Sequence, residues 1–432
     1  MRKMGVKILS LFDGMACGMI AMQLAGVEVE SYDAYEIDKY AIKTAQHNFP
    51  MIKEHGDVFD ADFTQYEGVD FLIGGSPCTY WSIAQTKNRE TVASGMGWEL
   101  FSQYVRALHE AKPKYFIYEN NKSMSKDIRA SIDKAFGFEA VLINSALVSA
   151  QNRQRLYWVG KRNADGTYSR VNVEQPADRG ILLKDVLDSE VAWKPMEQEL
   201  QTVFNKDGGV VGILNMKSQD AIKRVYGYNG KAPTLTTCGG GHREPKIFSM
   251  VAEPVHGMGN DTKSRTLTAN YWKTNVRDAF VDCAGGRTMA AEPINTDANE
   301  KAFCVTSRYY KGFGNNPGKC LEKHRDSMVA EPINITADGK EITIYEVRDG
   351  KITIKGKQYP IKLKDGFYII RKLTVSECKR LQTVPEWYEF PVSNSQAYKM
   401  LGNGWTCEII CHLINSCFKS VDALPGQIGL WG

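Results

Sequence analysis

Cys78 stands at the end of a short apolar run, in the stretch FLIGGSPCTYWS that covers residues 71–82. Such a run, bounded by turn residues, is typical of a buried strand in a parallel sheet. Gly74 and Gly75 permit a sharp turn or a close approach, and Pro77 fixes the backbone just before the cysteine. Open α/β sheets bind ligands at the carboxyl ends of their strands. The position therefore predicts a nucleophilic thiol, with a buried structural cysteine as the alternative.

Two further runs end in groups that suit chemistry on a heterocycle. YFIYENN ends one strand with Glu119 and Asn120, and a carboxyl group near a thiol can protonate or hydrogen-bond a ring nitrogen. In SAQNRQRLYWVG, Arg153 and Arg155 lie two residues apart on an extended run, so we expect their side chains to share a face. Paired guanidinium groups suit a phosphate or a polarised carbonyl oxygen, although either arginine alone is also typical of a solvated surface.

A third set of residues predicts a cofactor site. In SLFDGMACGMIA, Phe12, Gly14 and Gly18 form a glycine-rich turn between a strand and a helix. Glu36 ends the second strand, where a carboxylate accepts hydrogen bonds from ribose hydroxyls, although an exposed charge is the alternative. Asp57 is expected at the end of a third strand, placed to accept from an adenine amino group. No phosphate-binding lysine loop accompanies them, which indicates an adenosine-containing cofactor without a phosphate chain.

The elements that position these residues alternate between strand and helix from residue 5 to about 160. This alternation predicts an α/β fold with a doubly wound, mostly parallel sheet. The expected strands cover 6–12, 27–36, 71–75, 115–120, 141–147 and 155–160, and the expected helices include 19–26, 38–49 and 99–112. Helical spacing returns after residue 366, notably over 395–418.

The middle of the chain has a different character, with frequent glycine, threonine and asparagine and a repeated phrase. MVAEPVHG, MAAEPINT and MVAEPINI begin at residues 250, 289 and 328, which are 39 residues apart. Such a recurrence indicates serial copies of one structural unit. We therefore predict a catalytic domain over 1–188, a smaller strand-rich insertion with internal repeats over 189–370, a hinge over 371–394, and a C-terminal segment over 395–432 that returns to the catalytic domain.

Composition sets broad limits on function. The 432 residues have a formal net charge of only +4, so any surface for nucleic acid must be local. The first residues are expected to form a strand rather than an export signal, and no apolar run is long enough to cross a membrane. Ten cysteines without a C-x-x-C pair indicate a reducing compartment, and we expect Cys407 and Cys411 to be core residues rather than metal ligands.

Taken together and in this order, the motifs closely resemble those of the cytosine-5 DNA methyltransferases of bacteria and phages. Nine stretches resemble the family's motifs I to VI, VIII, IX and X. In this order they are LFDGMACG, YEIDKYA, GDV, GGSPCTYWS, GWELFSQYVRAL, YENN, QNRQR, RKLTVSECKRLQTVPEWY and AYKMLGNGW. The resemblance covers residues 7–160 and 371 to about 415. The chain departs from the family pattern at Ala16 in motif I, at Thr79 and Trp81 in motif IV, and at Asn121 after motif VI.

The resemblance implies a methyltransferase fold and a reaction at cytosine C5. Cys78 would attack C6 of a base flipped out of double-stranded DNA, Glu119 would hydrogen-bond or protonate N3, and Arg155 with Arg153 would stabilise O2. The implied methyl donor is S-adenosylmethionine. Its expected site comprises Phe12, Asp13, Gly14, Gly18, Glu36, Ile37, Asp57, Val58, Pro77, Leu100 and Asn403.

The insertion would then serve as a target-recognition domain, with Ser82, Arg243, Arg265 and Arg308 as candidate DNA contacts. Its repeats raise the hypothesis of several recognition units. We expect a monomer without a metal, in the cytoplasm of a bacterial or phage-infected cell, within a restriction-modification context. An RNA cytosine-5 methyltransferase and a catalytically silent DNA-binding homologue are the alternatives. The long insertion disfavours the first, and the intact Cys78, Glu119, Arg153 and Arg155 disfavour the second.

Overall fold

The computed structural model describes residues 5–83, 89–188, 196, 198–205, 209–237, 243–252, 335–337 and 340–422. Their contacts divide the chain into two compact units. The first unit takes the described residues of 1–181, 233–243 and 375–432, and the second those of 182–232 and 244–374. Two of the candidate DNA contacts, Arg265 and Arg308, lie outside the described residues, as do the second copy of the repeated phrase and all but the last residue of the third.

The first unit is built around an eight-stranded sheet in the order β3-β2-β1-β4-β5-β7-β6, with β8 paired to β7. Strands β1 to β5 pair in parallel, and β7 runs antiparallel to β5, β6 and β8. This confirms the predicted doubly wound, mostly parallel sheet. The strands are β1 (Val6–Leu11), β2 (Val29–Tyr35), β3 (Lys53–Glu54), β4 (Phe71–Gly74), β5 (Tyr115–Asn121), β6 (Val141–Asn144), β7 (Gln154–Arg162) and β8 (Tyr168–Arg170).

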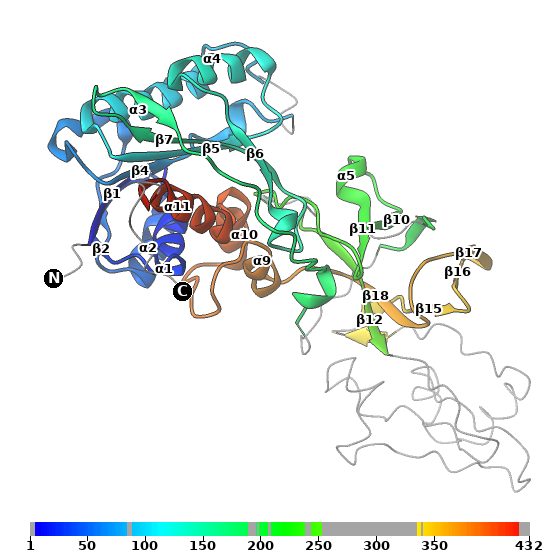
Figure 1. The fold of residues 1–432 in the computed structure, drawn as a ribbon. Coiled ribbons are helices and arrows are strands. Elements are labelled where there is room, and N and C mark those ends of the chain that lie inside the picture. Colours follow the sequence, from blue (N-terminus) through cyan, green and yellow to red (C-terminus); the bar gives the residue numbers. More distant parts are fainter. Residues whose placement is uncertain are drawn as a thin grey trace, which may run out of the picture. The chain divides into compact units, whose positions relative to one another are not determined.

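Helices cover both faces of this sheet (Figure 1). Helices α3 (Met96–Ala111) and α4 (Lys126–Phe136) lie on one face, and α1 (Cys17–Leu24) and α11 (Cys407–Asp422) on the other. The α3 and α4 face is packed with aromatic rings, because Tyr104 and Phe136 from these helices meet Phe116, Tyr118 and Trp158 from the strands. The unit also contains α2 (Lys39–Asn48), α9 (Val375–Leu381) and α10 (Asn394–Asn403).

The second unit is a mostly antiparallel sheet of eight strands in the order β17-β16-β15-β18-β12-β11-β10-β9. Its core includes Phe248 and Tyr368, whose rings stack with centroids 4.9 Å apart. The strands are β9 (Leu200–Val203), β10 (Val210–Leu214), β11 (Arg224–Gly227), β12 (Lys246–Ala252), β15 (Tyr345–Arg348), β16 (Lys351–Ile354), β17 (Lys357–Pro360) and β18 (Gly366–Lys372). The residues of this unit also include a short helix, α5 (Asp220–Lys223), and a separate hairpin, β13 (Ile335–Ala337) with β14 (Lys340–Ile342).

Within the described ranges, no helix combines the length and apolar character that a membrane span requires.

Candidate functional site

Glycine is needed at the end of β4 because the strand here lies against its neighbours without room for side chains. A Cβ on Gly74 would lie 2.7 Å from the carbonyl oxygen of Leu11, and one on Gly75 would lie 2.8 Å from that of Glu119. Both approaches are closer than a methyl group tolerates. The two glycines therefore let the chain leave the sheet edge directly beside Glu119, where Pro77 and Cys78 follow.

Cys78 begins a short 3-10 helix, Cys78–Tyr80, in which its backbone is firmly held. Its carbonyl oxygen accepts hydrogen bonds from the backbone N–H of Trp81 (3.1 Å) and Ser82 (3.0 Å) and from the side-chain amide of Asn121 (3.3 Å). The residue is partly exposed, and its sulfur forms no disulfide. A fixed backbone with an accessible thiol is the arrangement a cysteine nucleophile needs.

Glu119 lies on β5 and is only 9% exposed. Its two carboxyl oxygens have different partners: Oε1 forms an ion pair with Nε of Arg155 at 2.9 Å, and Oε2 accepts a hydrogen bond from the indole Nε1 of Trp405 at 3.0 Å. The β5 and β7 registers place Asn121 opposite Arg155, which explains how a β7 side chain reaches this carboxyl group. The structure therefore brings Glu119 and Arg155 together.

Arg153 is placed differently from Arg155. It precedes β7, is 2% exposed, and donates to the carbonyl oxygens of Leu235, Gly402 and Gly404 at 2.8–3.2 Å. Burial, helped by the charge of Arg155, lowers the pKa of Arg153 to about 10. The expectation that both guanidinium groups share one face is not met, because Arg153 turns into the protein to satisfy backbone carbonyls.

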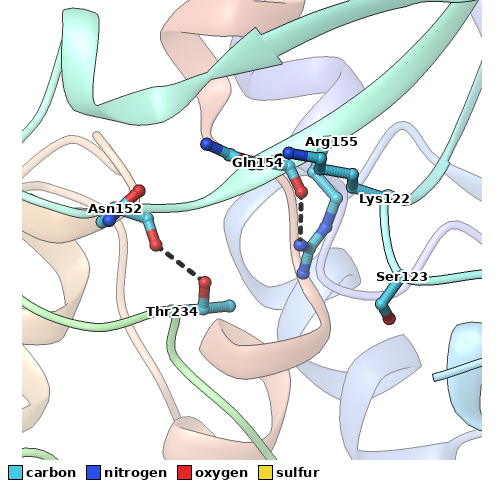
Figure 2. Close-up of a pocket in the computed structure, with 6 residues that line it drawn as sticks. All are labelled: Lys122, Ser123, Asn152, Gln154, Arg155 and Thr234. Atoms are coloured by element: carbon cyan, nitrogen blue, oxygen red, sulfur yellow. Dashed lines mark hydrogen bonds between the residues drawn. The ribbon is translucent and has the colours of Figure 1, made fainter. Parts of the chain in front are cut away.

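A pocket of about 480 Å³ opens beside Arg155 (Figure 2). It is lined by Lys122, Ser123, Asn152, Gln154, Arg155 and Thr234. Three hydrogen bonds join residues of its wall: Nζ of Lys122 donates to Oε1 of Gln154 at 2.6 Å, Nη1 of Arg155 to the carbonyl of Gln154 at 3.0 Å, and Oγ1 of Thr234 to the carbonyl of Asn152 at 2.8 Å. The lining is polar and carries two cationic side chains, which suits an anionic or polar ligand.

The expected cofactor residues lie at the carboxyl ends of β1 and β2. Glu36 accepts from the backbone N–H of Gly14 at 2.9 Å and from those of Ile37 and Asp38 at 2.8 Å. A carboxylate has about four lone-pair positions, so capacity remains for a hydroxyl donor. Ile37 is 74% exposed beside it. An exposed apolar surface next to a carboxylate fits the adenosine part of a cofactor, with a base to cover and hydroxyls to bind.

Other cofactor candidates fall into three groups. Phe12 and Leu100 are partly buried against the core cluster that contains Val58. Gly18 is a packing residue, because a Cβ there would lie 2.2 Å from Cδ1 of Ile73. The remaining two, Pro77 and Asn403, are exposed at the ends of β4 and α10.

The third strand is shorter than the sequence predicts. Strand β3 ends at Glu54, and Asp57 follows as the N-cap of a 3-10 helix, where it accepts from the N–H of Phe59 at 3.0 Å. Asp57 is still a carboxylate at this edge of the sheet, next to Phe59, which is exposed. A carboxylate beside an exposed ring retains the chemistry expected of an adenine contact.

Acidic groups behind this edge have raised pKa values. Asp13 accepts from the hydroxyls of Ser10 (2.5 Å) and Tyr32 (2.6 Å), and burial raises its pKa to about 6. Burial and the charges of Asp13 and Glu36 raise the pKa of Glu54 to about 8. Asp13 thus points into the protein. Among the described residues, no group of three or more His, Cys, Asp or Glu side chains is arranged to hold a metal ion.

Sequence reasoning missed two side chains that hold this site, Asn121 and Trp405. Asn121 stood out only as a departure from the family pattern, and the structure shows its amide bonded to the turn of Cys78. Trp405 lies 286 residues from Glu119 in the chain. Its only sequence signal is a large aromatic residue directly after the glycines of LGNGW.

Known proteins resemble this chain over nearly its whole length. It is 26% identical to the orphan methyltransferase M.Rho11sI of Bacillus phage rho11s, with 96% of this chain and 97% of the relative covered. It is 24% identical to the type II methyltransferase M.BanI of Aneurinibacillus aneurinilyticus, with 99% of each covered.

Solved structures support the fold. A DNMT2 mutant from Spodoptera frugiperda matches with a TM-score of 0.50 and 14% identity, over 96% of this chain and all of that one. The family model described as C-5 cytosine-specific DNA methylase matches residues 6–419. The chain therefore belongs to the C-5 cytosine-specific DNA methylase family, whose methyl donor is S-adenosylmethionine.

Proposed function

We propose that this protein transfers a methyl group from S-adenosylmethionine to C5 of cytosine in a specific sequence of double-stranded DNA. The observation that carries the proposal is the convergence of three groups at one sheet edge: the thiol loop of Cys78, the carboxyl group of Glu119 and the guanidinium group of Arg155. Gly75 separates the first two, and Arg155 contacts Glu119 at 2.9 Å. Family membership and the phage and bacterial methyltransferase relatives support the same reaction.

The chemistry needs a nucleophile and an acid on one ring. Cytosine C5 is a weak nucleophile until the ring loses its aromatic character. In the proposal, the thiolate of Cys78 forms a bond to C6 while Glu119 gives a proton to N3, which turns C5 into the nucleophilic carbon of an enamine. Arg155 hydrogen-bonds O2. After C5 has gained the methyl group, a water molecule takes the C5 proton, which restores the C5–C6 double bond and expels the thiolate of Cys78, and the N3 proton returns to Glu119.

S-adenosylmethionine supplies the methyl group when it is bound. Glu36 would accept from its ribose hydroxyls and Asp57 from its adenine amino group, and the exposed side chain of Ile37 would cover one face of the base. The turn through Phe12 and Gly14, where both residues have positive φ angles, brings the backbone close to this edge.

Duplex DNA hides C5 and C6 in the base stack, so the target base must be flipped out. The pocket beside Arg155 is of the size that holds small ligands, and the cations of Lys122 and Arg155 suit the backbone of an extruded nucleotide. We further propose that the second unit recognises the target sequence. In the first unit, Arg243 is exposed and Ser82 is partly exposed four residues after Cys78, as DNA contacts would require.

We also propose that the enzyme acts as a monomer in the cytoplasm of a bacterial or phage-infected cell. One catalytic set in each chain and the sources of the relatives support this. Size-exclusion chromatography with light scattering tests the monomer.

The proposed reaction is tested by mapping modified cytosines at base resolution in plasmid DNA from cells that produce the protein. The paired control is Cys78→Ala. We expect 5-methylcytosine in one or a few short contexts, and none with the variant. An empty map from folded protein would refute the DNA reaction, and RNA would be the next substrate.

A further inference from the structure

Trp405 is the second donor to the proposed acid, and nothing in the mechanism above uses it. Its indole N–H donates to Oε2 of Glu119 at 3.0 Å, while Nε of Arg155 forms an ion pair with Oε1 at 2.9 Å. An indole N–H can only donate and does not titrate near neutral pH. Oε2 is therefore held by a donor whose protonation does not change over the assayed pH range, while Oε1 lies beside the guanidinium group of Arg155.

The turn that carries Trp405 is fixed from several sides. It lies between α10, which ends at Asn403, and α11, which begins at Cys407. Arg153 donates to the carbonyls of Gly402 and Gly404, and Nε2 of Gln382 donates to Gly404 at 3.2 Å. This gives Arg153 a role that its burial alone does not explain: it holds the backbone from which the indole reaches Glu119.

The opposite side of the contact is equally restricted. A Cβ on Gly75 would lie 3.0 Å from Oε2 of Glu119 and 3.5 Å from Nε1 of Trp405. The carboxyl group is thus enclosed between the β4 turn, Arg155 and the indole. Such packing fixes the carboxyl group in one orientation. An acid that gives its proton to a single ring atom needs to be held in this way.

From this geometry we propose that Trp405 is a positioning residue for Glu119. Its N–H binds Oε2 and so directs Oε1, the oxygen shared with Arg155, toward N3 of the flipped base. This inference rests on the proposed cytosine C5 reaction. It assigns Trp405 no contact with DNA or cofactor.

The test is Trp405→Phe, which keeps an aromatic ring and removes the donor, measured in steady-state assays on methylatable DNA from pH 6 to 9. The charged and titratable groups around Glu119 are Arg153, Arg155, Tyr118 and Tyr157. All four are unchanged in the variant. We expect kcat to fall about tenfold, with the KM for DNA and for S-adenosylmethionine within twofold of wild type.

The pH profile gives a second measurement that does not depend on how much of the variant is folded. Because the indole N–H donates to the carboxyl group of Glu119, a positioning role predicts that its loss changes the pH profile of the rate, which a loss of packing alone would not do. The matched control is Trp387→Phe, since Trp387 is 51% exposed, and we expect its rate and profile to equal those of wild type.

Two outcomes would overturn the inference: a Trp405→Phe enzyme with unchanged kcat and pH profile, or one in which only KM rises. The Glu119→Gln variant tests whether Trp405 acts through Glu119. If it does, adding Trp405→Phe to Glu119→Gln should lower kcat by less than a further twofold. If wild-type protein methylates no DNA while remaining folded, the proposed function fails instead, and the two failures are therefore distinguishable.

Discussion

Replacing Arg153 with methionine should lower the free energy of unfolding by about 3 kcal/mol. Its guanidinium group makes four hydrogen bonds to three buried carbonyls. At about 1.5 kcal/mol each for bonds to a charged group, they contribute roughly 6 kcal/mol. The burial that lowers the pKa to about 10 opposes this by roughly 3 kcal/mol, at about 1.4 kcal/mol for each pKa unit.

Urea unfolding followed by circular dichroism measures this change, and the melting temperature should fall by roughly 6 to 12 °C. Arg162→Met is the matched control, because Arg162 is exposed at the end of the same strand, β7, and should cost less than about 0.5 kcal/mol. If Arg153→Met lowered the free energy of unfolding by less than 1 kcal/mol, or if Arg162→Met lowered it equally, the structural role assigned to Arg153 would be refuted.

Three further predictions follow from the site. Glu36→Ala should weaken S-adenosylmethionine binding at least tenfold in isothermal titration calorimetry, because the carboxylate that orders Gly14 and Ile37 is lost. An unchanged affinity would contradict a cofactor site at Glu36. Gly75→Ala should lower kcat about tenfold and stability by about 1–3 kcal/mol, since the new methyl group meets Glu119 at 2.8 Å; a fully active variant would contradict the packing. Glu54 has a raised pKa, so its contribution to stability is present below about pH 4.5 and is lost as the pH rises through about 8. Glu54→Gln should therefore raise the melting temperature at pH 8.5 but hardly at pH 5, and an equal effect at both would argue against a buried carboxylate.

The sequence predicts the strands of the first unit well because each is a short apolar run closed by turn residues. Cys78 and Glu119 end two such runs, β4 and β5, which pair in parallel. The carboxyl ends of parallel strands meet at one edge, so their proximity follows from topology alone.

Side-chain direction was less predictable. Arg153 and Arg155 have the spacing of residues on one face, but β7 begins only at Gln154. Arg153 therefore lies outside the strand's alternation, and carbonyls from Gly402 and Gly404 determine where it points. Those partners lie about 250 residues away, beyond the reach of any local pattern.

The C-terminal helices show the same limit. The apolar spacing predicts helix from Ser395 to Phe418, whereas the structure has α10 and α11 with a break at Gly404. The break follows from close packing, since a Cβ at Gly404 would lie 3.1 Å from Sγ of Cys17. This interruption is what presents Trp405 to Glu119.

The central claim is that the sulfur of Cys78 bonds to C6 of the target cytosine. DNA in which cytosine is replaced by 5-fluorocytosine tests it directly, because fluorine at C5 cannot leave as a proton does and the adduct cannot resolve. After incubation with S-adenosylmethionine and digestion, mass spectrometry should find the peptide containing Cys78 linked to a methylated fluorocytosine. Methyl transfer to normal DNA without any such adduct, or an adduct at another cysteine, would contradict the account.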